Sequence, residues 1–304
     1  MNLRDLKYLI ALADTRHFGK AAQRCFVSQP TLSGQIKKLE QELGISIFER
    51  SHRSVEITDA GKGVLRHARN IVEQADAIQQ LALSFRDPTA GALRIGAIPT
   101  ISPYLMPLIL KPLQQKYPQM KLIISEEQTD TLLQRLKNHE IDAAILATLH
   151  PEMDFNVLPL YREPFWLAYP PAHPFYNLDE ISQQDLDNSE LLLLAEGHCL
   201  AQQAMQACHM NERPERGEMA NLRASSLETL LQLVAVGYGT TLIPALSLTG
   251  SWISGRGVVT RELHLPNTWR QVSLLYRPSF PRAPALDALQ QVIKASLPNT
   301  VEKL

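Results

Sequence analysis

The chain has 304 residues, 45% of them hydrophobic, which is enough for two or three compact units with buried cores. No stretch reaches the ~18 uninterrupted apolar residues of a membrane span, and Arg4, Asp5 and Lys7 interrupt the segment where a secretion signal would be apolar. These features exclude a membrane-spanning or secreted class, and we expect a cytoplasmic protein, with no membrane partner, whose three cysteines stay reduced.

The formal net charge of -1 conceals an asymmetry between the two ends of the chain. Residues 1–86 hold 13 Lys and Arg against 9 Asp and Glu, whereas residues 87–304 hold 17 against 22. A basic head on an acidic body favours a polyanion as the partner of the head.

Three helical patterns open the chain. Apolar residues at three- and four-residue spacing predict a helix over residues 3–13, and a short second helix follows in FGKAAQRC. Ser28 as N-cap, Pro30 in the first turn and Gly44 just past the end predict a third helix. Cys25 falls at an inward-facing position of the second helix, and we interpret it as a small buried side chain.

The outer face of the third helix carries amides and hydroxyls near its N-terminus and lysines further along, where a solvated surface helix would more often show Glu and Lys throughout. Amides and hydroxyls match base edges in the major groove, and lysines match phosphates. IFERSHRSVEIT then alternates like a small hairpin with basic residues near its tip, as in a wing. We predict a winged helix-turn-helix over residues 1–58 that binds double-stranded DNA through Ser28, Gln29, Pro30, Thr31, Ser33, Gln35, Lys37, Lys38, Arg50 and Arg53.

The run LRDLKYLIALADTRHFGKAAQRCFVSQPTLSGQIKKLEQELGISIFER, followed by TDAG, closely resembles the N-terminal domain of LysR-type transcriptional regulators, in which SQPxLSxQIxxLE is the recognition helix. The resemblance covers roughly the first sixty residues without gaps. It implies a promoter-binding regulator, not an enzyme, that forms homodimers and homotetramers and contacts RNA polymerase.

A long helical pattern from Thr58 to about Phe85 predicts a connector over residues 59–87. Its apolar residues alternate steps of four and three, the heptad repeat of paired helices. Packing within one chain is the alternative, but we expect the head to offer no partner for so long a stripe. We therefore predict a homodimer seam made by Val64, Ala68, Ile71, Ala75, Ile78, Ala82 and Phe85.

Strand and helix patterns alternate in LRIGAIP, PYLMPLILKPLQQKY, KLIISEE, TLLQRLKNHE and AAILAT, which predicts parallel strands covered by helices. We expect one lobe over about residues 88–162 and 268–304, where the chain returns through a strand at 271–278, and a second over about 163–267, with strands near 164–170, 191–194, 217–223 and 240–243. The fold class is α/β with a helix-rich winged head. LysR-type effector domains, which this alternation resembles, have two lobes of periplasmic-binding-protein type joined by two crossover strands.

Two threonines of the first lobe lie where ligands bind in open α/β sheets, beyond the carboxyl ends of the strands. Thr100 follows the strand LRIGAIP, and Thr129 precedes the helix TLLQRLKN. Each hydroxyl either caps its helix or faces a ligand. Their matched locations favour a shared pocket.

EGHCLAQQAMQACHM places Cys199 and Cys208 on one predicted helix that begins at about Cys199. Nine helical residues separate the two by about 13.5 Å and turn them to opposite faces, whereas a disulfide needs Cα atoms within about 7 Å. A bond between them would therefore require the helix to unwind. The helix N-terminus favours the reactive thiolate of Cys199, a protonated His198 would add to this, and Cys208 among apolar neighbours is interpreted as a buried thiol that attacks the oxidised Cys199.

Other interpretations of the two thiols stay open on spacing alone. Two cysteines in the helix of a reduced protein are usually packing residues. A zinc site would use Cys199, Cys208, His198 and His209, which lack a CxxC spacing. We predict no metal and no other cofactor.

Longer motifs resemble the hydrogen-peroxide sensors of the LysR-type family over nearly the whole chain: IPTxxPYLxP, EEQTxxLLxxL, GHCLxxQAMxxC, RASSLETLLQLVAVGYGTTLIPAL and LLYRP. The resemblance implies that Cys199 reacts with hydrogen peroxide and that Cys208 closes a disulfide with it. It implies a peroxide pocket made by Thr100, Thr129, His198 and Arg270, re-reduction by glutaredoxin or thioredoxin, and control of oxidative-stress genes. Gln202 departs from the acidic residue that many relatives have three places after the reactive cysteine.

Two other functions are compatible with the sequence. A LysR-type regulator could instead bind a small metabolite between the lobes, as most of the family does. A thiol peroxidase would turn over with a reductant, but it has no use for a recognition helix.

Overall fold

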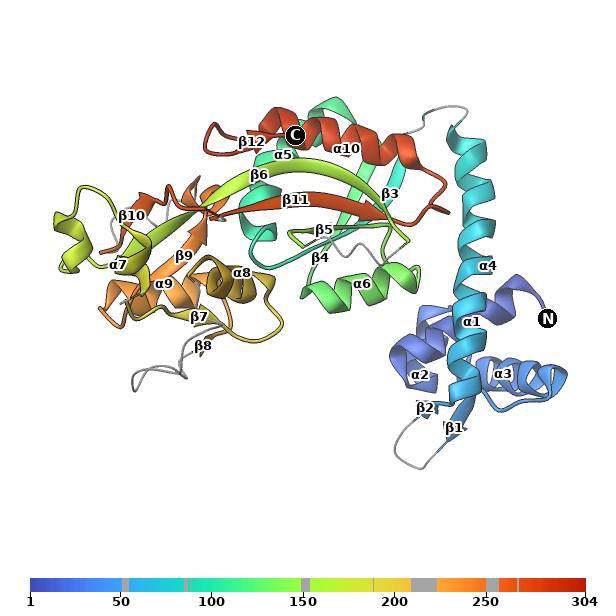
Figure 1. The fold of residues 1–304 in the computed structure, drawn as a ribbon. Coiled ribbons are helices and arrows are strands. Elements are labelled where there is room, and N and C mark those ends of the chain that lie inside the picture. Colours follow the sequence, from blue (N-terminus) through green and yellow to red (C-terminus); the bar gives the residue numbers. More distant parts are fainter. Residues whose placement is uncertain are drawn as a thin grey trace. The chain divides into compact units, whose positions relative to one another are not determined.

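The computed structural model describes residues 1–50, 55–84, 87, 89–148, 154–187, 189–208, 223–249, 257–266 and 268–304. The chain forms two compact units, Met1–Asp87 and Pro88–Leu304, which we call the head and the body (Figure 1). In the part of the chain so described, no helix is both long enough and apolar enough to cross a membrane.

The head contains the predicted helices and hairpin. Its elements are α1 (Leu3–Thr15), α2 (Phe18–Arg24), α3 (Gln29–Leu43), β1 (Phe48–Arg50), β2 (Val55–Ile57) and α4 (Asp59–Ser84), with β1 and β2 antiparallel. Ser28 caps α3, since its hydroxyl accepts a hydrogen bond from the Thr31 amide at 3.3 Å. Thr58 caps α4 in the same way, accepting from the Gly61 amide at 2.9 Å. The helices enclose a core that includes Leu9, Leu12, Leu32, Ile36 and Leu39.

The apolar stripe of the connector helix α4 has different surroundings in the two halves of the helix. Its first turns pack on the head, where Leu65 and Ala68 are buried and Val64 is partly buried against the head core. The expectation that the head offers this helix no partner is therefore wrong for its N-terminal half, since α1 covers it. Further along, Ile71 is 44% and Ile78 71% exposed. Of the predicted seam, the side chain of Ala82 and the whole of Phe85 lie outside the described residues.

The first lobe of the body is a helix-covered sheet (Figure 1). The strands β3 (Gly91–Ala97), β4 (Met120–Glu126) and β5 (Ala143–Leu146) are parallel, as predicted. The helices α5 (Ser102–Lys116), α6 (Thr129–Lys137) and α10 (Ala283–Ser296) pack in the same lobe, and β12 (Glu302–Lys303) adds a short strand. The buried side chains of strands and helices join in one apolar core that continues into the second lobe.

Two long strands run from the first lobe into the second. They are β6 (Asn156–Tyr169), whose second half is the strand expected near 164–170, and β11 (Trp269–Tyr276). The whole of β11 pairs antiparallel with residues 156–164 of β6, and β11 also pairs antiparallel with β5. The parallel arrangement predicted from the alternation at residues 93–147 is confirmed for β3, β4 and β5, whereas the crossover strands β6 and β11 run antiparallel to each other.

The second lobe is assembled from short elements. They are η1 (Pro174–Asn177), α7 (Gln183–Asp187), β7 (Leu193–Leu194), α8 (Cys199–Ala207), β8 (Arg223–Ala224), α9 (Leu227–Ala235), β9 (Thr241–Pro244), η3 (Ala245–Thr249) and β10 (Val259–Glu262). β7 and β8 are parallel, while β9 and β10 pair antiparallel with β6. Most of the strand expected at 217–223 lies outside the described residues.

Candidate functional sites: a DNA-reading helix and a cysteine-lined cavity

The N-terminal half of α3 presents the short polar groups expected of a DNA-reading helix. Gln29, Pro30 and Thr31 are exposed, while Ser33 and Gln35 are half-buried. The lysines Lys37 and Lys38 are exposed further along. The opposite face holds Leu32, Ile36 and Leu39 in the core, so packing fixes which face points outward.

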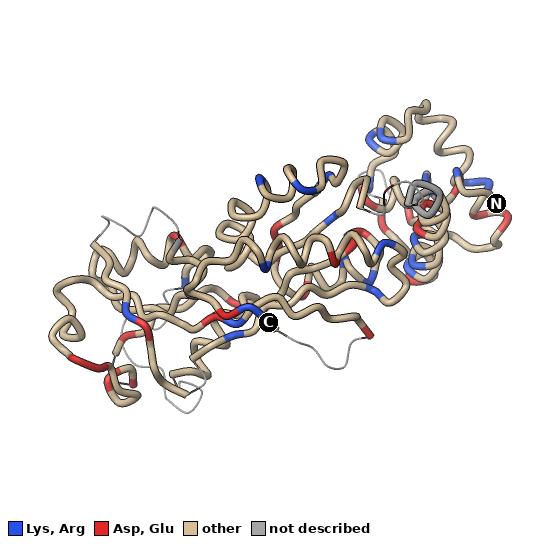
Figure 2. The backbone as a smooth tube through the Cα atoms, turned by 90° about the horizontal axis from the view of Figure 1, so that it is seen from above, with Lys and Arg blue, Asp and Glu red and all other residues tan. Residues whose placement is uncertain are grey.

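Basic residues also lie on other helices of the head, such as Arg4 and Lys7 of α1 and Lys20 of α2. Figure 2, with Lys and Arg in blue, shows basic positions on more than one helix of the head. Arg50 ends the first strand of the hairpin, but its side chain, like the whole of His52 and Arg53, lies outside the described residues. The predicted basic tip of the wing therefore has no structural description here.

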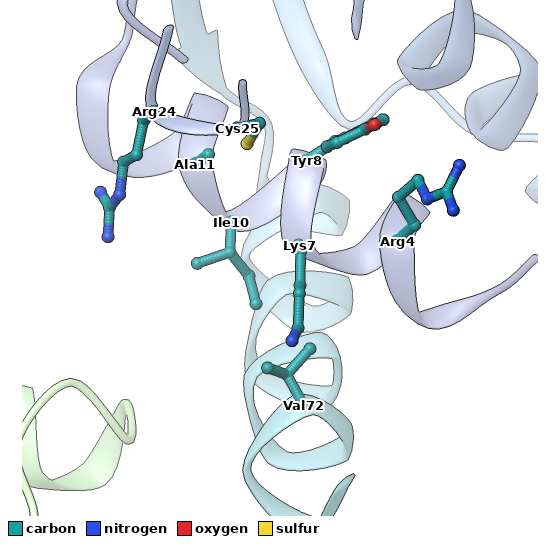
Figure 3. A pocket seen from close by; sticks show the side chains of 8 residues that line it. All are labelled: Arg4, Lys7, Tyr8, Ile10, Ala11, Arg24, Cys25 and Val72. Atoms are coloured by element: carbon teal, nitrogen blue, oxygen red, sulfur yellow. The ribbon is translucent and has the colours of Figure 1, made fainter. Parts of the chain in front are cut away.

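Cys25 differs from its sequence interpretation. It is half-buried against the head core and lines a cavity of about 410 Å³ together with residues of α1 and α4 (Figure 3). The predicted full burial is wrong because α2 ends at Arg24 and Cys25 already belongs to the cap of the helix. Burial still raises the pKa of the Cys25 thiol, against a smaller opposite effect of Arg24, so this thiol is not activated.

The two cysteines of the body occupy the two ends of α8. Cys199 is its first residue, and Cys208 is the residue that caps its C-terminus. Cys199 is partly exposed, whereas Cys208 is 1% exposed. The three cysteines form no disulfide in this structure. Cys199 and Cys208 are thus nine positions apart on one helix, about 13.5 Å along its axis, as the sequence predicted.

Cys199 opens onto a cavity of about 410 Å³. Its wall combines both lobes, with Thr129 and Thr148 from the first and His198 and Gln202 from the second, and it also includes Asp130, Glu196, Gly197, Ala201, Met205 and Arg223. Thr129 is 6% exposed, and its hydroxyl has no hydrogen-bond partner in the described structure. A buried hydroxyl without a partner is uncommon, so this one is available to a polar ligand in the cavity.

Thr100 and Arg270 form a second, fully buried cluster. Arg270 Nη1 donates to Thr100 Oγ1 at 2.9 Å, and Nη2 donates to the Thr100 carbonyl at 3.1 Å. Arg270 Nε donates to Glu163 Oε1 at 2.9 Å. Burial alone would lower the pKa of Arg270, but the charges of Glu163 and then of Cys199 raise it, so the guanidinium stays charged within electrostatic reach of Cys199.

Thr100 and Thr129, each predicted either to cap a helix or to face a ligand, have different roles in the structure. The N-cap of α5 is Ile101 and that of α6 is Gln128, so neither Thr100 nor Thr129 caps its helix. The Thr100 hydroxyl accepts a hydrogen bond from Arg270, and of these two threonines only Thr129 lines the cavity. The four predicted pocket residues are thus divided. Thr129 and His198 share the cavity wall with Cys199, while Thr100 and Arg270 form the adjacent buried cluster.

His198 precedes α8 and is half-buried in the cavity wall. Burial lowers its pKa. The neutral imidazole is therefore favoured at neutral pH, so the protonated form that would add to the activation of Cys199 is not the favoured one. Desolvation, which a sequence does not reveal, is the physical cause.

Three glutamine amides hold the segment between Glu196 and Cys208. Gln128 Nε2 donates to the Glu196 carbonyl at 3.3 Å, Gln203 Nε2 to the Ala147 carbonyl at 2.9 Å, and Gln183 Nε2 to the Ala207 carbonyl at 3.3 Å. Gly197, at φ +89°, lies directly against the Gln128 amide, where a Cβ would come within 2.4 Å of its oxygen. Hydrogen bonds from glutamine side chains therefore hold the segment at three points: before α8, along it and at its end.

Sequence reasoning missed Glu163, Gln128 and Gln203. Glu163 gives no clear signal, because it follows Arg162 in the strand and the two look like an ordinary pair of exposed charges. The two glutamines are ordinary polar residues in sequence, and only their partners in the other lobe give them a role. Among the described residues, no group of His, Cys, Asp and Glu has the arrangement of a metal site.

Comparison with known proteins agrees with this architecture. Residues 3–62 match the family of bacterial regulatory helix-turn-helix proteins, lysR family, and residues 86–298 match the LysR substrate binding domain. The chain belongs to the LysR family of DNA-binding transcriptional regulators. The sequence expectation of a DNA-binding regulator with a two-lobed α/β body is confirmed.

Within that family, its relatives are regulators rather than enzymes. The chain is 40% identical to the hydrogen peroxide-inducible genes activator of Dickeya chrysanthemi, covering 100% of this chain and 98% of the relative. It is equally similar to the DNA-binding transcriptional dual regulator OxyR of Escherichia coli K12, with the same two coverages. A full-length OxyR variant from Pseudomonas aeruginosa superposes with a TM-score of 0.82 at 38% identity, covering 98% of this chain and 99% of that one.

Proposed function

We propose that this regulator senses hydrogen peroxide through Cys199 and converts its oxidation into a Cys199–Cys208 disulfide. The observation that carries the proposal is the placement of the two thiols: Cys199 opens onto a polar cavity, and Cys208 is buried at the opposite end of the same helix. The similarity to hydrogen peroxide-inducible genes activators supports the same chemistry.

The reaction consumes one peroxide. The Cys199 thiolate attacks one peroxide oxygen, the O–O bond breaks, and the departing hydroxide takes up a proton to leave as water. The Cys199 sulfenic acid is then attacked by the sulfur of Cys208, the S–O bond breaks, and a second water leaves. The dithiol loses two electrons and the peroxide gains them. The unpartnered Thr129 hydroxyl provides a hydrogen bond to the bound peroxide, and the Arg270 cation lies close enough to stabilise negative charge at the reacting sulfur.

The disulfide couples chemistry to conformation. Because a disulfide brings Cα atoms within about 7 Å, its formation must unwind α8, and this breaks the hydrogen bond that Gln203 makes from within the helix. The new arrangement of the second lobe alters the packing of subunits in a homodimer or homotetramer and, through it, the spacing of the recognition helices. In the cytoplasm, glutaredoxin or thioredoxin restores the thiols, and the active form contacts RNA polymerase at promoters of oxidative-stress genes.

Peroxide titration of the full-length protein tests the proposal. Mass spectrometry of tryptic fragments should find the Cys199–Cys208 bond at roughly one equivalent of peroxide, and a Cys208→Ser variant should accumulate sulfenic acid at Cys199. Cys25→Ser is the matched control and should form the bond like the parent. No intramolecular bond at low stoichiometry would remove the mechanism.

A second candidate keeps the DNA-reading head and makes the body a receptor for a small metabolite. The size of the cavity favours it, because about 410 Å³ is far more than the ~30 Å³ share of one water molecule, and hydrogen peroxide is only slightly larger than water. A Cys208→Ser variant whose DNA binding still responds to peroxide like the parent would support this candidate and oppose the disulfide switch.

A further inference from the structure

The turn between α2 and α3 places a fully exposed phenyl ring beside the DNA-reading helix. Phe26 is 95% exposed, although apolar residues elsewhere in the head mostly pack in its core. It lies two residues before Ser28, the N-cap of α3, and three before the exposed Gln29. The ring is therefore next to the end of the helix whose short polar groups face outward.

The backbone of this turn favours glycine at the same position. Phe26 has φ +55°, in the left-handed region. The Phe26 amide donates to the Gln23 carbonyl at 3.1 Å and the Val27 amide to the Ala22 carbonyl at 3.0 Å. These two bonds form a Schellman motif, whose left-handed residue is usually glycine because a Cβ is disfavoured there. Phenylalanine thus brings backbone strain and exposed apolar area to a place where glycine would bring neither.

Nothing within the described head compensates for either penalty, since the ring is almost completely exposed. Backbone strain and exposed apolar area that contacts within the fold do not offset are characteristic of a residue that takes part in binding. DNA is the partner that already meets this end of α3. We propose that Phe26 contacts apolar carbon atoms of the DNA, either a thymine methyl group at the edge of the major groove or a deoxyribose of the adjoining backbone. Phe26 then adds to affinity and selects sites from outside the recognition helix.

Three substitutions separate this role from a structural one. Phe26→Gly and Phe26→Asn remove the ring, and both residues tolerate the left-handed region, so the thermal stability of each variant should equal or exceed that of the parent. Phe26→Tyr keeps the ring. The probe is a duplex of about 40 base pairs selected by the parent protein from a random library, long enough for two half-sites about one DNA turn apart.

Affinity is measured by fluorescence anisotropy over a series of salt concentrations. Phe26→Gly and Phe26→Asn should each bind about fivefold to tenfold more weakly, and Phe26→Tyr like the parent. The slope of log affinity against log salt should not change, because an apolar contact releases no counterions. Deoxyuridine in place of single thymines distinguishes the two carbon sources. A loss seen with the parent but not with Phe26→Gly identifies a thymine methyl, and no such position identifies a deoxyribose.

Two results would overturn the proposal. One is parental DNA affinity of Phe26→Gly, including the case in which only its oligomeric state or its activation of RNA polymerase changes, which would assign the ring to a protein partner. The other is a reduced salt slope, which would show that the ring only positions phosphate contacts. Neither result affects peroxide sensing, which is measured separately at Cys199.

Discussion

Arg270 and Glu163 face each other across the two crossover strands and are joined by a 2.9 Å hydrogen bond between Nε and Oε1. Both side chains are buried, Arg270 at 2% and Glu163 at 0% exposure. The second carboxylate oxygen of Glu163 accepts from the Leu246 amide at 2.8 Å. The pair thus holds a positive charge near Cys199 and binds the crossover strands to the second lobe.

Neutralising Glu163 should be strongly destabilising. Glu163→Gln preserves the shape of the side chain but leaves the Arg270 charge without its counter-charge, and removing one partner of a buried pair costs about 3 kcal/mol. Urea denaturation measures the change in the free energy of unfolding. The exposed Glu302→Gln serves as control and should stay within about 0.5 kcal/mol of the parent. Equal losses in the two variants would show that the buried pair has no special role.

The Thr129 hydroxyl should matter for the reaction and not for the fold. Thr129→Val removes a buried hydroxyl that has no partner, so stability should be unchanged or slightly higher. Oxidation of Cys199, followed by stopped-flow trapping of the sulfenic acid, should slow about tenfold if one hydrogen bond to peroxide is lost. Thr300→Val removes a second buried unpartnered hydroxyl that does not line the cavity, and its oxidation rate should equal that of the parent. An unchanged rate in Thr129→Val would exclude this hydroxyl from the reaction.

The glutamine contacts should set how readily the disulfide forms. Gln203→Leu removes the hydrogen bond to the Ala147 carbonyl, which exists only while α8 is folded. Losing about 1 kcal/mol from the thiol form makes the reduction potential of the pair about 20 mV more negative. Redox titration measures this potential. Gln206→Leu changes an exposed glutamine of the same helix and should leave it unaltered, so identical shifts would point to helix propensity rather than to the contact.

Acidification should destabilise the body partly through His198. Because burial lowers the pKa of His198 in the folded state, the unfolded chain binds a proton first as pH falls. The favourable contribution of the neutral imidazole is complete above the unfolded pKa of about 6.5 and is lost below it. A His198→Gln variant should therefore lose less stability than the parent between neutral pH and roughly pH 5. Denaturant midpoints across that range test the difference, and parallel curves would contradict it.

The exposed part of α4 should mediate self-association. Ile78→Glu places a charge in the predicted seam, where the present isoleucine is 71% exposed, and should weaken the dimer at least about tenfold. Analytical ultracentrifugation measures the association. Gln74→Glu adds the same charge at an exposed position outside the predicted stripe and should leave the dimer intact. A dimer that survives Ile78→Glu would locate the interface elsewhere.

Local sequence signals predicted much of this architecture. The limits of α3 follow from its caps, Ser28 and Gly44, which act within a few residues. The helical spacing of Cys199 and Cys208 is likewise a local property of the sequence. The pairing of Arg270 with Glu163 depends on the register of two strands 107 residues apart, which no local pattern encodes. The same limit applies to Gln128 and Gln203, whose carbonyl partners lie in the opposite lobe.

Two features of the structure differ from what the sequence pattern suggests, each for a different physical reason. The heptad stripe of α4 looks uniform in sequence, but Val64 and Ala68 pack on the head while Ile78 does not, because the head ends partway along the helix. Phe26 lies in the short apolar run of residues 25–27, which is typical of core residues, so its 95% exposure is not predictable from the sequence. Only the left-handed backbone of its turn directs the ring outward.

Hydrogen exchange of the α8 amides in the dithiol and disulfide forms most directly tests whether a single helix separates the reacting sulfurs. With the Cys199–Cys208 bond confirmed by mass spectrometry, we predict that peptides covering residues 200–207 are protected in the dithiol form and lose that protection on oxidation. Protection that persists in the disulfide form would contradict the account, since the bond would then have formed without unwinding the helix.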